Sequence, residues 1–277
     1  MMSILFADDT TMYACHDNVI NLTNIMSEEL LKVSNWLMDN SLTLNISKTY
    51  YVIFGLRQVP NYIRITIGQQ VLDKQEYGKF LGVYLDEKLT FKKHIDYVYS
   101  KISKTSGLLF KLKHSFPLDV LRNLYLSLIC PYLNYCILSW GCASQTLLNP
   151  ISLLQKRLIR LISGSEFYAH TNPLFKAQNI LKLCDIFKLQ CQIFMYRTMV
   201  TDKYPQYKEK IRSLQSTHHY NTRSNHLRTP YCRLNTCKQL VLYQGISNWN
   251  CLPTFIKEKR SVGSFRKYCK NYYIDLY

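Results

Sequence analysis

Residues 3–13 read Ser-Ile-Leu-Phe-Ala-Asp-Asp-Thr-Thr-Met-Tyr, and this stretch decides how the N-terminal part of the chain folds. Two adjacent acids, Asp8 and Asp9, separate an apolar run from a second, partly apolar run. Two such runs around a short polar break are typical of paired strands. The stretch therefore predicts a β-hairpin that carries both carboxylates at its turn.

The two carboxylates indicate a metal site or a surface turn. Burying two like charges side by side is costly unless a cation neutralises them. Mg²⁺ suits this pair, because it prefers carboxylate oxygens and shares its other positions with water and phosphates. Such a hairpin can supply one strand of a two-metal phosphoryl-transfer site. The alternative is that Asp8 and Asp9 cap an exposed turn, where Asp is common.

Three further segments follow the hairpin along the chain. Apolar residues recur at three- and four-residue steps over 21–38 and predict a helix. An Asn-Ile-Ser-Lys-Thr segment follows at 45–49, and Phe-Leu-Gly-Val-Tyr-Leu-Asp stands at 80–86. In this order, with Phe-Ala-Asp-Asp at 6–9, they resemble the reverse transcriptases of non-LTR (LINE-type, Jockey-like) retrotransposons. The resemblance is strong to about residue 115 and looser beyond.

The resemblance implies RNA-directed DNA synthesis in the intact protein, from an RNA template, a DNA primer and deoxynucleoside triphosphates. It implies that Asp8 holds Mg²⁺ and that Asp9 assists at the catalytic site. By its place in the Asn-x-x-Lys-Thr segment, Lys48 is expected near the phosphates of the incoming nucleotide. The primer grip is expected at Phe80, Leu81 and Gly82, and no small-molecule cofactor besides nucleotide and metal is expected.

A two-metal site also needs a carboxylate from a second strand. In the family that Asp lies upstream of the hairpin, and no other Asp of this chain has a comparable strand context. The chain is therefore expected to be a C-terminal polymerase portion that lacks the fingers and the upstream Asp and is inactive alone. Two alternatives stay open: a non-catalytic nucleic-acid-binding remnant, and a helical interaction protein with no nucleic-acid role.

The charge is unevenly distributed. Residues 1–55 hold two lysines against six acids, and residues 56–277 hold 33 basic residues against 12 acids. Basic residues gain affinity for nucleic acid by releasing phosphate counterions, so salt-dependent and largely sequence-blind binding is expected. The candidate phosphate contacts are Lys92, Lys93, Lys101, Lys104, Lys156, Arg157 and Arg160.

The pattern predicts an α+β fold: a partial palm of hairpin, helix and strands over 1–87, a mostly helical thumb over 88–165 and a helical, basic C-terminal region over 166–277. Tyr62–Ile67 alternates as a strand does. Three thumb helices are predicted. The first spans 91–112, and its inner face is formed by Ile95, Val98, Ile102 and Leu109. The second begins at Pro117, and the third spans 152–162 and is ended by Gly164. A helix or helix pair is expected over 173–199 and a linker near 200–230.

The cysteines, the N-terminus and one uncharged stretch bear on where the protein is expected to act. The ten cysteines form no dense framework and no signal peptide is evident, so reduced thiols of a nuclear or cytoplasmic ribonucleoprotein are expected, not a secreted protein. Residues 124–143 carry no charge but include Pro131, and they predict a buried helix broken there and no membrane span. The spacing of Cys232 and Cys237 fits no common zinc knuckle.

The last segment, 210–277, mixes aromatic and basic residues. Its aromatic candidates are Tyr220, Tyr231, Tyr243, Trp249, Tyr268, Tyr272 and Tyr273. Aromatic rings beside Arg and Lys suit stacking on single-stranded RNA or DNA. They suit a small packed core with a basic surface equally well, so both interpretations stay open.

Overall fold

The computed structural model describes residues 2–7, 9–55, 60, 62–215 and 226–277. It combines helices with small two-stranded sheets and confirms the mixed α+β class. The chain forms two compact units, residues 1–93 and 94–277, and each is described by itself. The predicted division into palm, thumb and C-terminal region at 87 and 165 stays a prediction.

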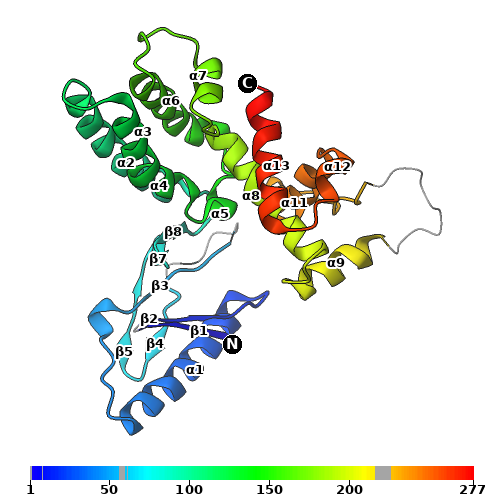
Figure 1. Cartoon of the computed structure of the whole chain (residues 1–277). Helices are drawn as coiled ribbons and strands as arrows, with labels where there is room; N and C mark the ends of the chain where they lie inside the picture. The colour runs from blue at the N-terminus through cyan, green and yellow to red at the C-terminus, as the bar shows by residue number, and fades with distance from the viewer. Residues whose placement is uncertain (1, 8, 56–59, 61, 216–225) are drawn as a thin grey trace. The chain divides into compact units, whose positions relative to one another are not determined.

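The N-terminal unit opens with the predicted hairpin (Figure 1). Strands β1 (Met2–Phe6) and β2 (Asp9–Tyr13) pair antiparallel, and Phe6 lies opposite Asp9. Ala7 stands in the turn with a φ of 51°. Asp8, the predicted metal ligand, lies outside the described residues.

Helix α1 (Val19–Asp39) covers the predicted helical segment, and the side chain of Asn18 caps it by accepting from the backbone N–H of Ile20 at 2.8 Å. Met26 and Leu30 of α1 pack on a small core of Ile65, Ile67 and Leu72. The buried isoleucines confirm the alternation over 62–67. The paired segments here are β3 (Tyr50–Tyr51) with β6 (Asp73–Lys74), and β4 (Thr66–Ile67) with β5 (Gln70–Val71).

The chain between α1 and β3, which includes the Asn-Ile-Ser-Lys-Thr segment, forms no strand. The chain turns at Ser41, whose φ is 58°, and forms the 3₁₀ helix η1 (Ile46–Lys48). Leu44 and Ile46 pack against the core below α1. The burial of these two side chains decides the local path in place of strand pairing.

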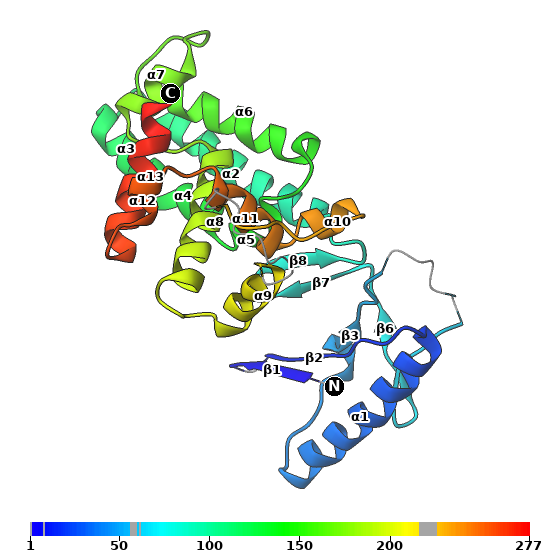
Figure 2. The ribbon, with the colours of Figure 1, turned by 90° about the vertical axis from the view of Figure 1, so that its right-hand side faces the viewer.

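A second hairpin ends this unit, formed by β7 (Tyr77–Phe80) and β8 (Val83–Asp86) (Figure 2). Leu81 and Gly82 form its two-residue turn, with φ values of 44° and 82°. Positive φ at both positions defines the type I′ turn that suits the twist of paired strands, and glycine adopts it readily.

The second unit starts within α2 (Lys92–Leu112), whose predicted inner face is buried throughout. The uncharged stretch 124–143 is divided among α3 (Leu118–Leu128), α4 (Cys130–Asn134) and α5 (Ile137–Trp140). The break at Ile129, two residues before Pro131, confirms the predicted interruption. Within the described residues, no helix is both long enough and apolar enough to cross a membrane.

Helix α6 (Gln145–Ile162) begins seven residues before the predicted start and carries Pro150 near its N-terminal end. It ends as predicted at Gly164, whose φ is 62°. The N–H groups of Gly164 and Ser165 donate to the carbonyls of Leu161 and Arg160, which closes a Schellman cap. The predicted helix pair follows as α7 (Thr171–Ala177) and α8 (Leu183–Met199).

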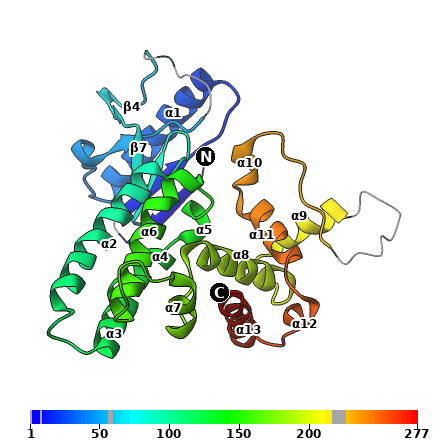
Figure 3. The ribbon, with the colours of Figure 1, turned by 90° about the horizontal axis from the view of Figure 1, so that it is seen from above.

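Helix α8 is buried on nearly all sides, because α5, α11 and α13 all contact it (Figure 3). The other elements of this region are α9 (Pro205–Gln215), α10 (Asn235–Lys238), α11 (Val241–Asn250), α12 (Thr254–Lys257) and α13 (Val262–Asp275). The predicted linker over 200–230 thus contains a helix, since Ile211 on α9 is buried with 1% of its surface exposed.

Candidate functional site

The acidic hairpin is largely exposed. Asp9 stands at the first position of β2 with its side chain exposed, and Leu5 and Phe6 on β1 are 72% and 61% exposed. Among the described residues, no group of three or more His, Cys, Asp or Glu side chains could hold a metal ion. The described carboxylates therefore do not amount to a complete metal cage, and the part of Asp8 stays a prediction.

Lys48 is the last residue of η1, and its side chain is exposed. In the part of the chain that the structure describes, no ion pair joins Lys48 to Asp9. The 3₁₀ turn is held by the N–H groups of Lys48 and Thr49, which donate to the carbonyls of Asn45 and Ile46. The proximity of Lys48 to a nucleotide phosphate stays a prediction.

The predicted primer grip lies on the turn between β7 and β8. The hydroxyl of Tyr50 accepts from the N–H of Lys79 at 3.0 Å, which ties β7 to the segment of β3. A Cβ at Gly78 would come within 3.2 Å of the Tyr50 ring, so glycine permits this close approach. Phe80, Leu81 and Gly82 are thus carried by an anchored hairpin, and Leu81 is 37% exposed.

The sequence missed the part that Asp86 plays beside this hairpin. Its two carboxylate oxygens accept from the N–H groups of Thr90 and Phe91 at 2.9 and 2.7 Å. These bonds satisfy backbone donors just before α2 and place a negative charge near the positive end of that helix. Asp86 therefore fixes the point at which the basic helix begins.

Helix α2 separates apolar and basic residues. Lys92, Lys93, Lys101 and Lys104 are exposed, whereas Ile95, Val98, Ile102 and Leu109 are buried. The ammonium groups of Lys93 and Lys101 lie 4.8 and 5.4 Å from the ring centres of Tyr77 and Tyr97. Such contacts orient a lysine without neutralising its charge.

The basic residues of α6 divide into two kinds. Lys156 and Arg157 are exposed. The Nε–H of Arg160, by contrast, donates to the carbonyl of Ala169 at 2.8 Å and holds the loop before α7. Among the described residues, none of the seven predicted phosphate-contacting cations forms an ion pair with a carboxylate.

A buried histidine at the start of α2 was also missed by the sequence. His94 is 2% exposed, and its ring lies 5.7 Å from that of Trp140 in an edge-to-face arrangement. Neither ring nitrogen has a hydrogen-bond partner among the described residues. Burial lowers the pKa of His94 from 6.5 to about 4, because the charged imidazolium loses its hydration.

Comparison with known proteins identifies relatives of one kind. The chain is 27% identical over 199 residues to the RNA-directed DNA polymerase from mobile element jockey of Drosophila melanogaster, which covers 70% of this chain and 22% of that protein. It is 30% identical over 175 residues to the jockey polymerase of Drosophila funebris, which covers 61% of this chain and 19% of that protein. A probable RNA-directed DNA polymerase from transposon BS of Drosophila melanogaster is 27% identical over 63% of this chain and 20% of its own length.

The chain thus spans about a fifth of the length of the curated relatives that it matches. No family model matches it. No solved structure matches it either. The chain is similar to the RNA-directed DNA polymerases of non-LTR mobile elements, in agreement with the resemblance stated from the sequence.

Proposed function

We propose that this chain is the palm–thumb portion of an RNA-directed DNA polymerase of a mobile element, and that it binds the primer–template duplex. The proposal rests on an N-terminal hairpin whose sequence carries Asp8 and Asp9, followed along the chain by a strongly basic helix, and on the similarity to such polymerases. In the intact protein the partners are RNA template, DNA primer and deoxynucleoside triphosphates, within a nuclear or cytoplasmic ribonucleoprotein.

The acidic hairpin contributes Asp8 and Asp9 to the polymerase site. Carboxylate oxygens are the ligands that Mg²⁺ prefers, and when bound it would stabilise charge on the transferred phosphoryl group. The described residues supply no complete ligand set, so a further carboxylate has to come from elsewhere in the polymerase. The exposed apolar residues of β1 are consistent with a hairpin that packs on other palm strands in the working enzyme.

The 277-residue chain by itself is expected not to extend a DNA primer on an RNA template, because we propose that the second-strand carboxylate of the metal site comes from a part of the polymerase outside this chain. Primer extension with Mg²⁺ and all four deoxynucleotides measures this. The wild-type chain should match an Asp8→Ala, Asp9→Ala double variant, with no product from either. Extension by the wild type that the double variant lacks would refute the incomplete site.

Helix α2 is the proposed contact to the duplex. Lys101 and Lys104 stand three residues apart on one side of the helix and are exposed, so both ammonium groups can reach phosphates of one backbone. The single acid of this helix is Asp96. Phosphate contacts position a duplex without reading its sequence, so binding is expected to be general for RNA–DNA hybrids.

Lys101→Gln with Lys104→Gln should weaken binding of a blunt RNA–DNA hybrid and reduce the slope of log K against log salt by about 2, since each lost phosphate contact releases about 0.9 fewer counterions. Fluorescence anisotropy across a salt series measures both quantities. Lys32→Gln with Lys74→Gln is the matched control, because it removes the same charge from lysines paired with Glu29 and Glu87 outside α2. Equal losses in the two double variants would show that only net charge matters.

An exposed Asp9 without a described ligand cluster favours one second candidate, a non-catalytic nucleic-acid-binding protein. This candidate shares the α2 surface and differs in giving the acids no role. Supplying the upstream palm of a jockey polymerase distinguishes the two: extension that depends on Asp8 supports the polymerase, and hybrid binding without extension supports the binding protein.

A further inference from the structure

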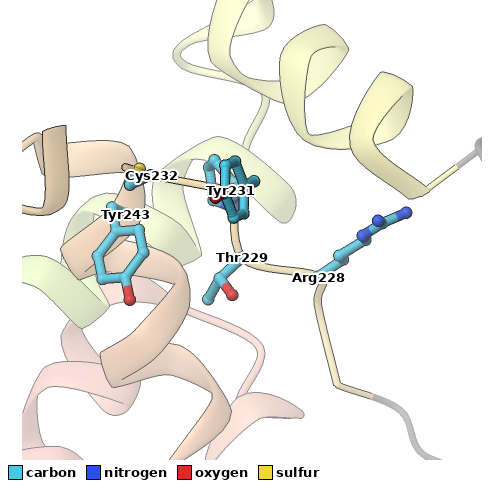
Figure 4. A pocket seen from close by; sticks show the side chains of 6 residues that line it. Arg228, Thr229, Tyr231, Cys232 and Tyr243 are labelled. Atoms are coloured by element: carbon cyan, nitrogen blue, oxygen red, sulfur yellow. The ribbon is translucent and has the colours of Figure 1, made fainter. Parts of the chain in front are cut away.

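We propose that the C-terminal region carries a separate binding site for a single nucleic-acid strand, formed by Arg228, Thr229, Tyr231 and Tyr243. These residues line a pocket of about 400 Å³ (Figure 4). Pockets of this size suit small ligands such as one nucleotide unit. The site goes beyond the duplex contact proposed for α2 and does not depend on it.

The chain segment that includes this pocket carries charge of one sign. No acid occurs in the sequence between Glu209 and Glu258. The same span holds seven basic residues: Lys210, Arg212, Arg223, Arg228, Arg233, Lys238 and Lys257. A segment with this excess of basic residues attracts polyanions.

Two reciprocal hydrogen bonds hold the pocket-forming segment on α11. The side-chain oxygen of Asn250 accepts from the N–H of Leu227 at 2.9 Å, and its side-chain nitrogen donates to the carbonyl of Leu227 at 2.7 Å. The irregular segment from Arg228 to Cys232 therefore leaves a fixed point. Figure 4 shows Arg228, Thr229 and Tyr231 along this segment and Tyr243 on α11 beside it.

The tyrosine exposure separates stacking candidates from core residues. Trp249 and Tyr273 are buried, and Tyr268 lies under the ammonium group of Lys259 at 4.0 Å. Tyr231, by contrast, is 93% exposed, so almost the whole ring faces water. An exposed ring in a basic segment offers a surface on which a base of a single strand can stack, since every base has a flat π-face. Tyr220, another stacking candidate, lies outside the described residues.

The spacing of these residues fits one nucleotide step. Tyr231 follows Arg228 by three residues, a span of at most about 10 Å in extended chain. A base stacked on Tyr231 therefore leaves a neighbouring phosphate within reach of the Arg228 guanidinium, which binds phosphate oxygens through paired N–H donors. The Thr229 hydroxyl, which lies between them in sequence, can donate to the same phosphate.

The test uses the full chain with a 12-nucleotide oligouridylate, the matching oligothymidylate and a blunt RNA–DNA hybrid. Tyr231→Ala should weaken binding of a single strand roughly tenfold and leave hybrid binding unchanged, because stacking on an aromatic ring stabilises each base by about 1–3 kcal/mol. Tyr231→Phe should restore the affinity. Arg228→Gln should reduce the salt slope for the single strand by about 0.7, and Arg228→Lys should retain it.

Tyr168→Ala is the matched control, because Tyr168 is 90% exposed in the same unit but lies between α6 and α7. Stronger binding of oligouridylate identifies RNA as the ligand, and stronger binding of oligothymidylate identifies DNA. The proposal is overturned if neither oligonucleotide binds, or if Tyr231→Ala and Tyr168→Ala have the same effect. Loss of hybrid binding in the Lys101→Gln, Lys104→Gln variant, with single-strand binding intact, would confirm that the two surfaces act separately.

Discussion

Replacing Gln155 by leucine lowers the free energy of unfolding by about 3 kcal/mol, because three buried polar groups then lose a partner. Gln155 lies on α6 with 2% of its surface exposed. Its side-chain nitrogen donates to the Tyr125 hydroxyl at 3.1 Å and to the Leu181 carbonyl at 3.0 Å. Its side-chain oxygen accepts from the N–H of Leu183 at 2.9 Å.

The last of these bonds explains why the effect is large. Leu183 is the first residue of α8, and the N–H groups of a first helical turn have no partner within the helix. Lys182 at the N-cap forms no side-chain capping bond, so the side chain of Gln155 on α6 accepts from the N–H of Leu183 instead. Gln155 thus ties α3, α6 and the start of α8 together.

Urea unfolding followed by circular dichroism measures the change. Gln145→Leu serves as the control, because Gln145 lies on the same helix, is exposed, and its side-chain nitrogen donates to the side-chain oxygen of Asn149 at 2.9 Å. That variant should change stability by no more than about 0.5 kcal/mol. Equal midpoints for the two variants would show that the buried bonds of Gln155 contribute little.

The second large effect concerns His94 and pH. Because the pKa of His94 is lowered to about 4 in the folded state, the unfolded chain, with a pKa near 6.5, binds the proton more readily. Stability from neutral His94 is therefore fully present above pH 6.5 and is lost progressively as the pH falls from 6.5 to about 4. The shift corresponds to about 3 kcal/mol.

His94→Leu removes this dependence, because leucine carries no titratable group and keeps the site apolar beside Trp140. The measurement is the midpoint of urea unfolding for wild type and variant at pH 7.5, 5.5 and 4.5. The difference between the two proteins should grow in favour of the variant as the pH falls. A constant difference over this range would mean that His94 titrates normally in the folded chain.

Elements with a regular apolar pattern could be predicted from the sequence. The hairpin at 2–13, α1 and α2 all form where the pattern places them, since each buries or pairs residues at one fixed period. The end of α6 at Gly164 could also be predicted from the sequence, because glycine adopts the positive φ of the cap without strain. These features depend on neighbours within a few residues.

Features decided by distant contacts escaped the sequence. Helix α6 starts at Gln145 and includes Pro150, because Leu148 and Ile151 are buried and extend its apolar face beyond the predicted start at 152. The bonds from Gln155 to the start of α8 and from Asn250 to Leu227 depend on where other segments lie. The buried His94 gives no sign in the local pattern, since its partner ring belongs to α5.

In the candidate site, too, residue types could be predicted from the sequence, but side-chain exposure and contacts could not. The sequence indicates which residue types gather, namely the acids of the hairpin, the lysines of α2 and the aromatics of 210–277. It could not separate Tyr231 from Trp249, because exposure depends on packing against α8 and α13. Arg160 likewise looks the same as Arg157 in the sequence, and only the structure shows that Arg160 bonds to the Ala169 carbonyl.

We expect this chain to bind nucleic acid as part of an RNA-directed DNA polymerase. The affinity of the whole chain for a blunt RNA–DNA hybrid at several salt concentrations tests this expectation. The hybrid should bind at low salt, and log K should fall linearly with log salt, with a slope of several units. No binding at low salt, or an affinity that salt does not change, would contradict it.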